Sequence, residues 1–199
     1  MALITEIIPE QGSEKVLNRL GAILFLEISN QITLQSIPDD FALFIGRQEP
    51  YDKSEDVVVN VRPSNVSFTG QTQEGVQGDN VYNIDIYAQG RSTQVVSGNT
   101  VSKDKMQRYL GFVRYILGST NYKTLEFPYG LIGGVNVQSV QHDLRYGEED
   151  ANFISFARFQ VSVRINECQE LWDVSPLEGV DTVVKLDETD KGFKIIFNN

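Results

Sequence analysis

The sequence predicts an α+β fold: an antiparallel or mixed β-sheet with two helices packed on one face, long loops and a C-terminal β-hairpin extension. Two observations lead to this prediction. Apolar residues recur at helical spacing in two segments, 14–30 and 102–117, and alternate with polar residues in several others. The order along the chain is helix, strands, helix, strands, which is typical of a sheet with its helices on one side.

The first helix is expected over residues 14–30, with Ser13 as its N-cap and Glu14 in its first turn. Phe25 and Leu26 widen its apolar stripe, so more than one side of this helix is expected to be covered. The residues that define the stripe are Val16, Leu17, Leu20, Ile23, Leu24 and Ile28.

Three strands are expected between the two helices. Residues 41–46 form a short apolar run, and the valines of 57–61 alternate with other positions. Pro63 interrupts that second strand, which is expected to resume over 66–68 after a bulge. Tyr82, Ile84, Ile86 and Ala88 alternate with the polar residues Asn83, Asp85 and Gln89, which predicts a strand with one buried face.

The second helix is expected over residues 102–117, capped by Ser102 and ended by Gly118. Two further strands are expected at 135–140 and 159–165, the latter giving the strongest alternation in the chain. Five aromatic residues stand at core spacing: Tyr82, Tyr87, Tyr109, Phe112 and Tyr115.

The connections predict three long polar loops, at residues 69–80, 90–100 and 121–134, because these stretches are rich in Gly, Gln, Ser and Asn. Loops of this length are usually functional, and their composition favours contacts with other subunits over chemistry. Residues 1–174 are expected to form the core domain and 175–199 an extension with a hairpin, which can add to the sheet edge of a neighbour.

Charge and cysteine content exclude several functions. A formal net charge of −10 and a pI near 4.6 disfavour specific nucleic-acid binding, and DNA is expected only as non-specific passing cargo. Cys168 is the one cysteine, so no internal disulfide and no zinc site of the usual Cys/His type is expected. The sequence contains no signal-peptide pattern and no apolar run long enough to span a bilayer, so no membrane partner is expected.

No catalytic, cofactor-binding or metal-binding residues are predicted. The chain lacks a dinucleotide or Walker phosphate loop, and Gly130, Gly133 and Gly134 are interpreted as turn residues. His142 and Asp143 form the sole His/carboxylate pair, and they are interpreted as surface residues at a strand end. The acidic residues 148–150 are interpreted as a solvated turn, and the protein is expected not to be an enzyme.

Two sequence fragments carry a resemblance to a known family. Residues 82–88 read Tyr-Asn-Ile-Asp-Ile-Tyr-Ala before the second helix, and 157–163 read Ala-Arg-Phe-Gln-Val-Ser-Val near the end of the core. Together with the order of elements over residues 13–166, they resemble the strands of bacteriophage tail terminator proteins, also called tail-completion proteins.

The resemblance implies a non-enzymatic virion protein of the tail or neck, made in the bacterial cytoplasm. Its copies would form a ring, usually a hexamer, that caps the tail tube, ends its polymerisation and joins it to the head connector. A head-closure, baseplate or secretion-tube component is the alternative, and an unrecognised binding module or enzyme the next. The candidate interface residues are those of the first two polar loops: Gln71, Gln73, Glu74, Gln77 and Arg91.

Overall fold

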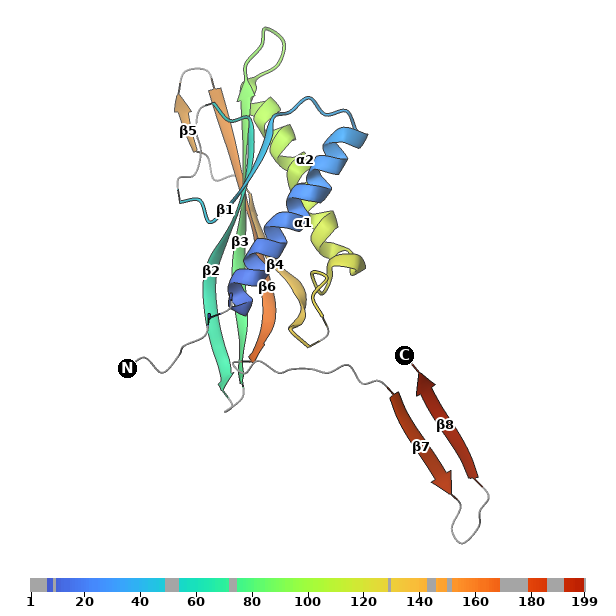
Figure 1. Ribbon diagram of the computed structural model, residues 1–199. Helices are drawn as coiled ribbons and strands as arrows, with labels where there is room; N and C mark the ends of the chain where they lie inside the picture. Colours follow the sequence, from blue (N-terminus) through green and yellow to red (C-terminus); the bar gives the residue numbers. More distant parts are fainter. Residues whose placement is uncertain are drawn as a thin grey trace. The chain divides into compact units, whose positions relative to one another are not determined.

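Figure 1 shows the computed structural model of the chain. The described residues are 7–8, 10–48, 54–71, 75–128, 130–142, 146–149, 152–168, 179–185 and 192–198. The chain separates into two compact units, Met1–Gln169 and Glu170–Asn199. The first unit holds both α-helices and one sheet, and the second unit holds a two-stranded hairpin.

The first unit is built on a mixed sheet with strand order β1-β2-β3-β6-β4, and β5 pairs with β6 beside this path. β1 runs parallel to β2, and the other pairs are antiparallel. Both helices lie on the same face of this sheet, so the predicted α+β class is confirmed (Figure 1). The strands are β1 (Phe41–Ile45), β2 (Val57–Gln71), β3 (Gly75–Arg91), β4 (Ile132–His142), β5 (Tyr146–Glu149) and β6 (Asn152–Cys168).

The core lies between the helices and the sheet. Apolar stripes of α1 (Gly12–Leu34) and α2 (Gly98–Gly118) pack on the alternate residues that point to one side of the strands. A smaller apolar cluster of Val58, Tyr87 and Phe156 lies on the opposite face. The fully buried core side chains include Leu20, Leu24, Ile28, Val59, Tyr82, Ile84, Met106, Tyr109, Phe159 and Val161.

Both helices begin earlier than predicted. The N-cap of α1 is Gln11, which forms a capping box with Glu14, so the prediction of Ser13 as cap was wrong. The N-cap position of α2 is Ser97, and Ser102 lies in the second turn with its hydroxyl 2.8 Å from that of Ser155 in β6. Ser102 therefore fastens the helix to the sheet, a role that depends on a residue far away in the sequence.

The predicted loop over residues 69–80 was wrong, because β2 and β3 continue through most of it. β3 lies between two partners here, with Gly78 opposite Phe68 in β2 and Ile165 in β6. A Cβ atom at Gly78 would lie 2.1 Å from the carbonyl oxygen of Ser67, so the glycine permits a close approach of the two strands. The predicted bulge after Pro63 is confirmed by a register shift between Pro63 and Asn65.

The other two predicted loops are also shorter than expected. β3 extends to Arg91 and α2 begins at Gly98, which leaves residues 92–97 as the connection. Over residues 121–134 the chain first completes a short 3₁₀ helix, η1 (Thr120–Tyr122), and β4 begins already at Ile132. The strand pairing that extends β3 and β4 comes from β6, which is distant in sequence from both loops.

The second unit is the predicted hairpin. β7 (Gly179–Lys185) and β8 (Gly192–Asn198) pair antiparallel over their full lengths, from Gly179 opposite Asn198 to Lys185 opposite Gly192. Each strand has seven residues, within the range of ordinary strands, and the pair forms a separate two-stranded sheet.

Candidate interaction surfaces

The interface residues predicted from sequence do not converge on one site. Gln73 and Glu74 lie outside the described residues. Gln71 is the last residue of β2, and Gln77 is an exposed residue of β3, opposite Gly70 and Asn166. Gln71 and Gln77 therefore belong to paired strands and not to a loop.

Arg91 lies at the other end of β3 from Gln77 and is exposed there, opposite Asn152 in β6. Arg91 follows Gln77 by fourteen positions along the strand, which corresponds to about 46 Å at roughly 3.3 Å per position. If both residues contact other molecules, they do so at opposite ends of the sheet.

An unpredicted surface lies on the solvent side of α1. Between Gly21 and Leu34 this helix contains one charged residue, Glu27, whose carboxylate accepts a hydrogen bond from the Tyr122 hydroxyl. The exposed positions of this stretch include Phe25 and Leu26, whose exposed fractions are 52% and 66%. Because the outer side of a surface helix is normally charged or polar, this one has the character of an interface.

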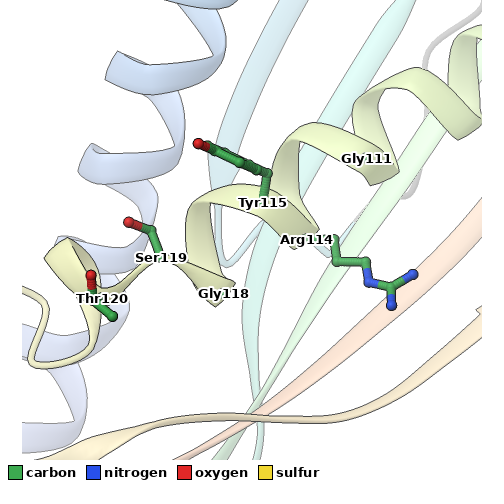
Figure 2. Close-up of a pocket in the computed structure, with 6 residues that line it drawn as sticks. All are labelled: Gly111, Arg114, Tyr115, Gly118, Ser119 and Thr120. Atoms are coloured by element: carbon green, nitrogen blue, oxygen red, sulfur yellow. The ribbon is translucent and has the colours of Figure 1, made fainter.

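The solvent side of α2 carries a shallow groove of about 550 Å³ beside Tyr115, whose exposed fraction is 82% (Figure 2). Its width comes from two glycines, since a Cβ atom at Gly111 or Gly118 would meet nothing within 4 Å. Figure 2 shows the Tyr115 ring and the Arg114 guanidinium directed to opposite sides of the helix. The groove is lined by Gly111, Arg114, Tyr115, Gly118, Ser119 and Thr120.

These positions on the two helices form what we call the outer helix face. It is the solvent-exposed side of the two helices, which contact one another. Phe25 at its margin also stacks on Phe41 of β1, with 6.2 Å between the ring centroids. Its members are Ala22, Phe25 and Leu26 of α1 and Gly111, Tyr115 and Gly118 of α2. The prediction that Tyr115 belongs to the core was wrong, whereas Tyr82, Tyr87 and Tyr109 are buried.

The sequence contains one indication of the outer helix face, although the spacing of apolar residues alone does not distinguish the exposed residues from those of the core. Phe25 and Leu26 were expected to widen a covered stripe, and they are instead exposed by more than half. The useful signal is the scarcity of charge along residues 21–34, because a helix that faces only water would carry charged residues there.

A charged cluster fastens α2 to the start of β2. Lys105 Nζ lies 2.7 and 2.8 Å from the two carboxylate oxygens of Asp56 and 3.3 Å from Asp39 Oδ1, and Arg108 Nη1 lies 3.4 Å from Asp39 Oδ2. Burial, followed by the negative charges of Asp39 and Asp56, raises the pKa of Tyr109 beside them. The opposite charges balance within the cluster, so its chemistry is that of a structural anchor.

The sheet face opposite the helices carries a polar ladder. The Asp85 carboxylate is 1% exposed and accepts hydrogen bonds from Arg62 Nε at 2.9 Å and from Arg158 Nε at 2.7 Å and Nη2 at 3.1 Å. In the neighbouring row of side chains, Gln160 of β6 donates a hydrogen bond to Asn83 of β3 and accepts one from Ser139 of β4. Every charge named here has a partner, which favours a role in aligning β2, β3 and β6.

The described residues offer no metal site, since no three His, Cys, Asp or Glu side chains among them are grouped to hold an ion. His142 is exposed at the last position of β4, and Asp143 lies outside the described residues. None of the described helices has the length and apolar character needed to cross a bilayer.

Comparisons with protein-family models and with curated proteins yield no relative. No protein-family model matches the sequence, and no curated protein matches it either. The functional argument therefore depends on the residues and surfaces described above.

Proposed function

We propose that this protein is a structural subunit of a bacteriophage tail or neck, whose copies close into a ring, hexameric as the family resemblance implies. The ring caps the tail tube, ends its polymerisation and joins it to the head connector. The observation that carries the proposal is the outer helix face, which exposes Phe25, Leu26 and Tyr115 on helices that are otherwise well packed on the sheet.

An exposed apolar helix face is stabilised when another protein covers it, because its apolar area is then removed from water. In a ring of identical copies, the covering surface is a different patch on the next copy. A mechanism of this kind needs shape and complementarity at two faces and no reacting groups. The extensive ion pairing of Lys105 and of Asp85 supports a rigid subunit for this purpose.

The net charge of the chain supports a ring through which DNA passes. A net charge of −10 repels the phosphate backbone, so DNA can pass through a ring of such subunits without adhering to it. The partners of the proposed ring are further copies of the chain, the tail tube protein and the head–tail connector or neck proteins, in the assembled virion.

The first test is the mass of the purified full chain by size-exclusion chromatography with light scattering. The proposal expects a concentration-dependent species with several times the 22.4 kDa mass of one copy. A protein that stays monomeric at high concentration and ignores tail tubes would contradict it.

A second measurement separates the proposal from its closest alternative. Negative-stain images of the protein mixed with purified tail tubes are expected to show density at one end of each tube, and tube growth is expected to stop. A head-closure or baseplate component would form an assembly without this effect on free tube ends. An enzyme or binding module would instead act on a small molecule.

A further inference from the structure

The register of the C-terminal hairpin divides its residues into two unlike faces. Residues directly opposite one another in an antiparallel pair share a face, and alternate positions along each strand do so as well. One face therefore carries Val180, Thr182, Val184, Phe193, Ile195 and Phe197, all apolar except for one threonine. The other face carries three charged residues, Asp181, Lys185 and Lys194, together with Gly179, Val183, Gly192, Ile196 and Asn198.

A two-stranded hairpin of this size is marginal in water by itself. Its apolar face gives it a way to gain stability, provided that another apolar surface covers that face. The core of the first unit is complete without it, because residues such as Leu20, Tyr109 and Phe159 are fully buried by their own unit. The hairpin thus supplies an apolar face that the described core does not need.

Strand addition at a sheet edge is a poor alternative for this hairpin. The edge strand on one side, β1, has only five residues, and beyond it the edge of β2 contains Pro63 and two register shifts. On the other side of the sheet, β4 also contains two register shifts. Prolines and bulges on edge strands hinder the addition of a further strand, so docking through the apolar face is favoured.

Charge favours the helix layer as the receiving surface. Residues 170–199 contain seven acidic and three basic residues. Of the four basic residues of α2, Lys105 and Arg108 are paired within the charged cluster, whereas Lys103 and Arg114 are exposed outside it. Lys103 and Arg114 therefore attract the acidic extension, and Arg114 lines the same groove as Tyr115 of the outer helix face.

We propose that the β7–β8 hairpin docks through its apolar face on the outer helix face of a second copy of this chain. The inference rests on the proposed ring, because a ring needs a donor and an acceptor on every copy. Ten residues separate Cys168 from Gly179, and a chain of that length spans at most about 36 Å, which sets the upper limit for the distance between the end of β6 and the docked hairpin.

The first experiment compares two full-length double variants by light scattering. Phe193→Ser with Phe197→Ser changes the apolar face, and Val183→Ser with Ile196→Ser makes a matched change on the opposite face. The first variant is expected to lose the ring and elute as a monomer, while the second keeps the mass of the unaltered protein. Equal behaviour of the two variants would overturn the proposal.

The second experiment mixes two variants that each lack one side of the contact. Assembly of the mixture cannot result from a misfolded hairpin, because it requires one intact hairpin and one intact outer helix face. Leu26→Asp with Tyr115→Asp removes the acceptor, and Phe193→Ser with Phe197→Ser removes the donor. Each variant alone is expected to be monomeric, and an equimolar mixture is expected to form 1:1 dimers through the one intact contact. A mixture that remains monomeric, or docking of the hairpin on its own copy, would overturn the proposal.

The outcomes also separate this inference from the proposed function. If the unaltered chain forms a ring that the Phe193 and Phe197 substitutions leave intact, hairpin docking is wrong and the ring proposal stands. If the unaltered chain never assembles, the ring proposal itself is wrong. A photo-crosslinker at position 193 of the full chain, followed by peptide mapping, is expected to label α1 or α2 of another copy.

Discussion

At the scale of single residues, Asp85 links three strands of the sheet. Its carboxylate is buried and binds Arg62 on β2 and Arg158 on β6, and both guanidinium groups remain partly exposed. Removing one partner of such a group leaves unpaired charge and lost hydrogen bonds, which costs more than the pair itself contributes. Asp85 is therefore the polar residue on which we expect the sheet to depend most.

Asp85→Asn is predicted to lower the free energy of unfolding by about 2 to 3 kcal/mol, since two arginines lose their charged partner. Urea denaturation followed by circular dichroism measures this change. Asp79→Asn is the matched control, because Asp79 lies on the same strand and is exposed; its effect is expected to stay below about 0.5 kcal/mol. Similar losses for both variants would contradict the role of Asp85.

A second residue-scale prediction concerns Tyr82, whose hydroxyl donates a hydrogen bond to the Ser13 carbonyl oxygen at 2.9 Å. Burial is the largest cause that raises the pKa of Tyr82 from its ordinary value near 10 to about 12. The unfolded chain loses this proton first, so the stabilisation is fully present below pH 10 and is lost as pH rises through 12.

Urea denaturation at a series of pH values from 8 to 12 tests this effect. The free energy of unfolding is expected to fall above pH 10, and the fall is expected to be smaller in Tyr82→Phe. Tyr115→Phe is the control, because its ring is largely exposed, and it should reproduce the pH dependence of the unaltered protein. An unchanged slope in Tyr82→Phe would show that other groups cause the loss.

At the scale of secondary structure, the start of α2 approaches β3 more closely than side chains allow. A Cβ atom at Gly90 would lie 2.1 Å from the Gly98 carbonyl oxygen and 2.4 Å from the Ser102 nitrogen. Both are backbone atoms, which cannot rotate away, so the glycine permits the helix to begin directly against the strand. The Ser102–Ser155 contact of 2.8 Å then fixes that first part of α2 on β6.

Gly90→Ala is predicted to destabilise the protein by about 2 to 3 kcal/mol, because the helix start must move away from β3. Gly111→Ala is the matched change at an exposed position of α2 where nothing lies within 4 Å; it is expected to stabilise the protein by up to about 1 kcal/mol. Thermal and urea denaturation at the same protein concentration measure both. A neutral result for Gly90→Ala would contradict the close approach.

At the scale of the whole molecule, the proposed ring assigns the contact between copies to the outer helix face. Its apolar residues contribute little to the core of the first unit, since Leu26 and Tyr115 are mostly exposed. A change there can alter assembly and leave the fold in place, which separates the two properties experimentally.

Leu26→Asp and Tyr115→Asp are each predicted to reduce the assembled fraction at least tenfold, because a carboxylate would have to be buried at the contact. Light scattering measures the assembled fraction, and far-ultraviolet circular dichroism is expected to remain unchanged. Val95→Asp, at an exposed apolar position outside the helices, is the control and should assemble normally. Normal assembly of both helix variants would exclude this face as the contact.

The sequence by itself determined the α+β class, the two helices, the first short strand and the C-terminal hairpin, because helical and strand periodicities are local properties of the chain. It also located the bulge after Pro63, since proline cannot donate a hydrogen bond to the sheet. It did not determine where strands end, because pairing with the distant β6 extends β3 into a Gly- and Gln-rich segment that resembles a loop.

Only the tertiary structure decided which apolar residues are left uncovered. Phe25, Leu26 and Tyr115 have the same spacing as core residues, and their exposure depends on where the sheet and the other helix lie. The same holds for Asp85, whose two arginine partners come from strands that are adjacent only in the folded sheet. Periodicity states which residues share a side of an element, whereas packing decides what that side meets.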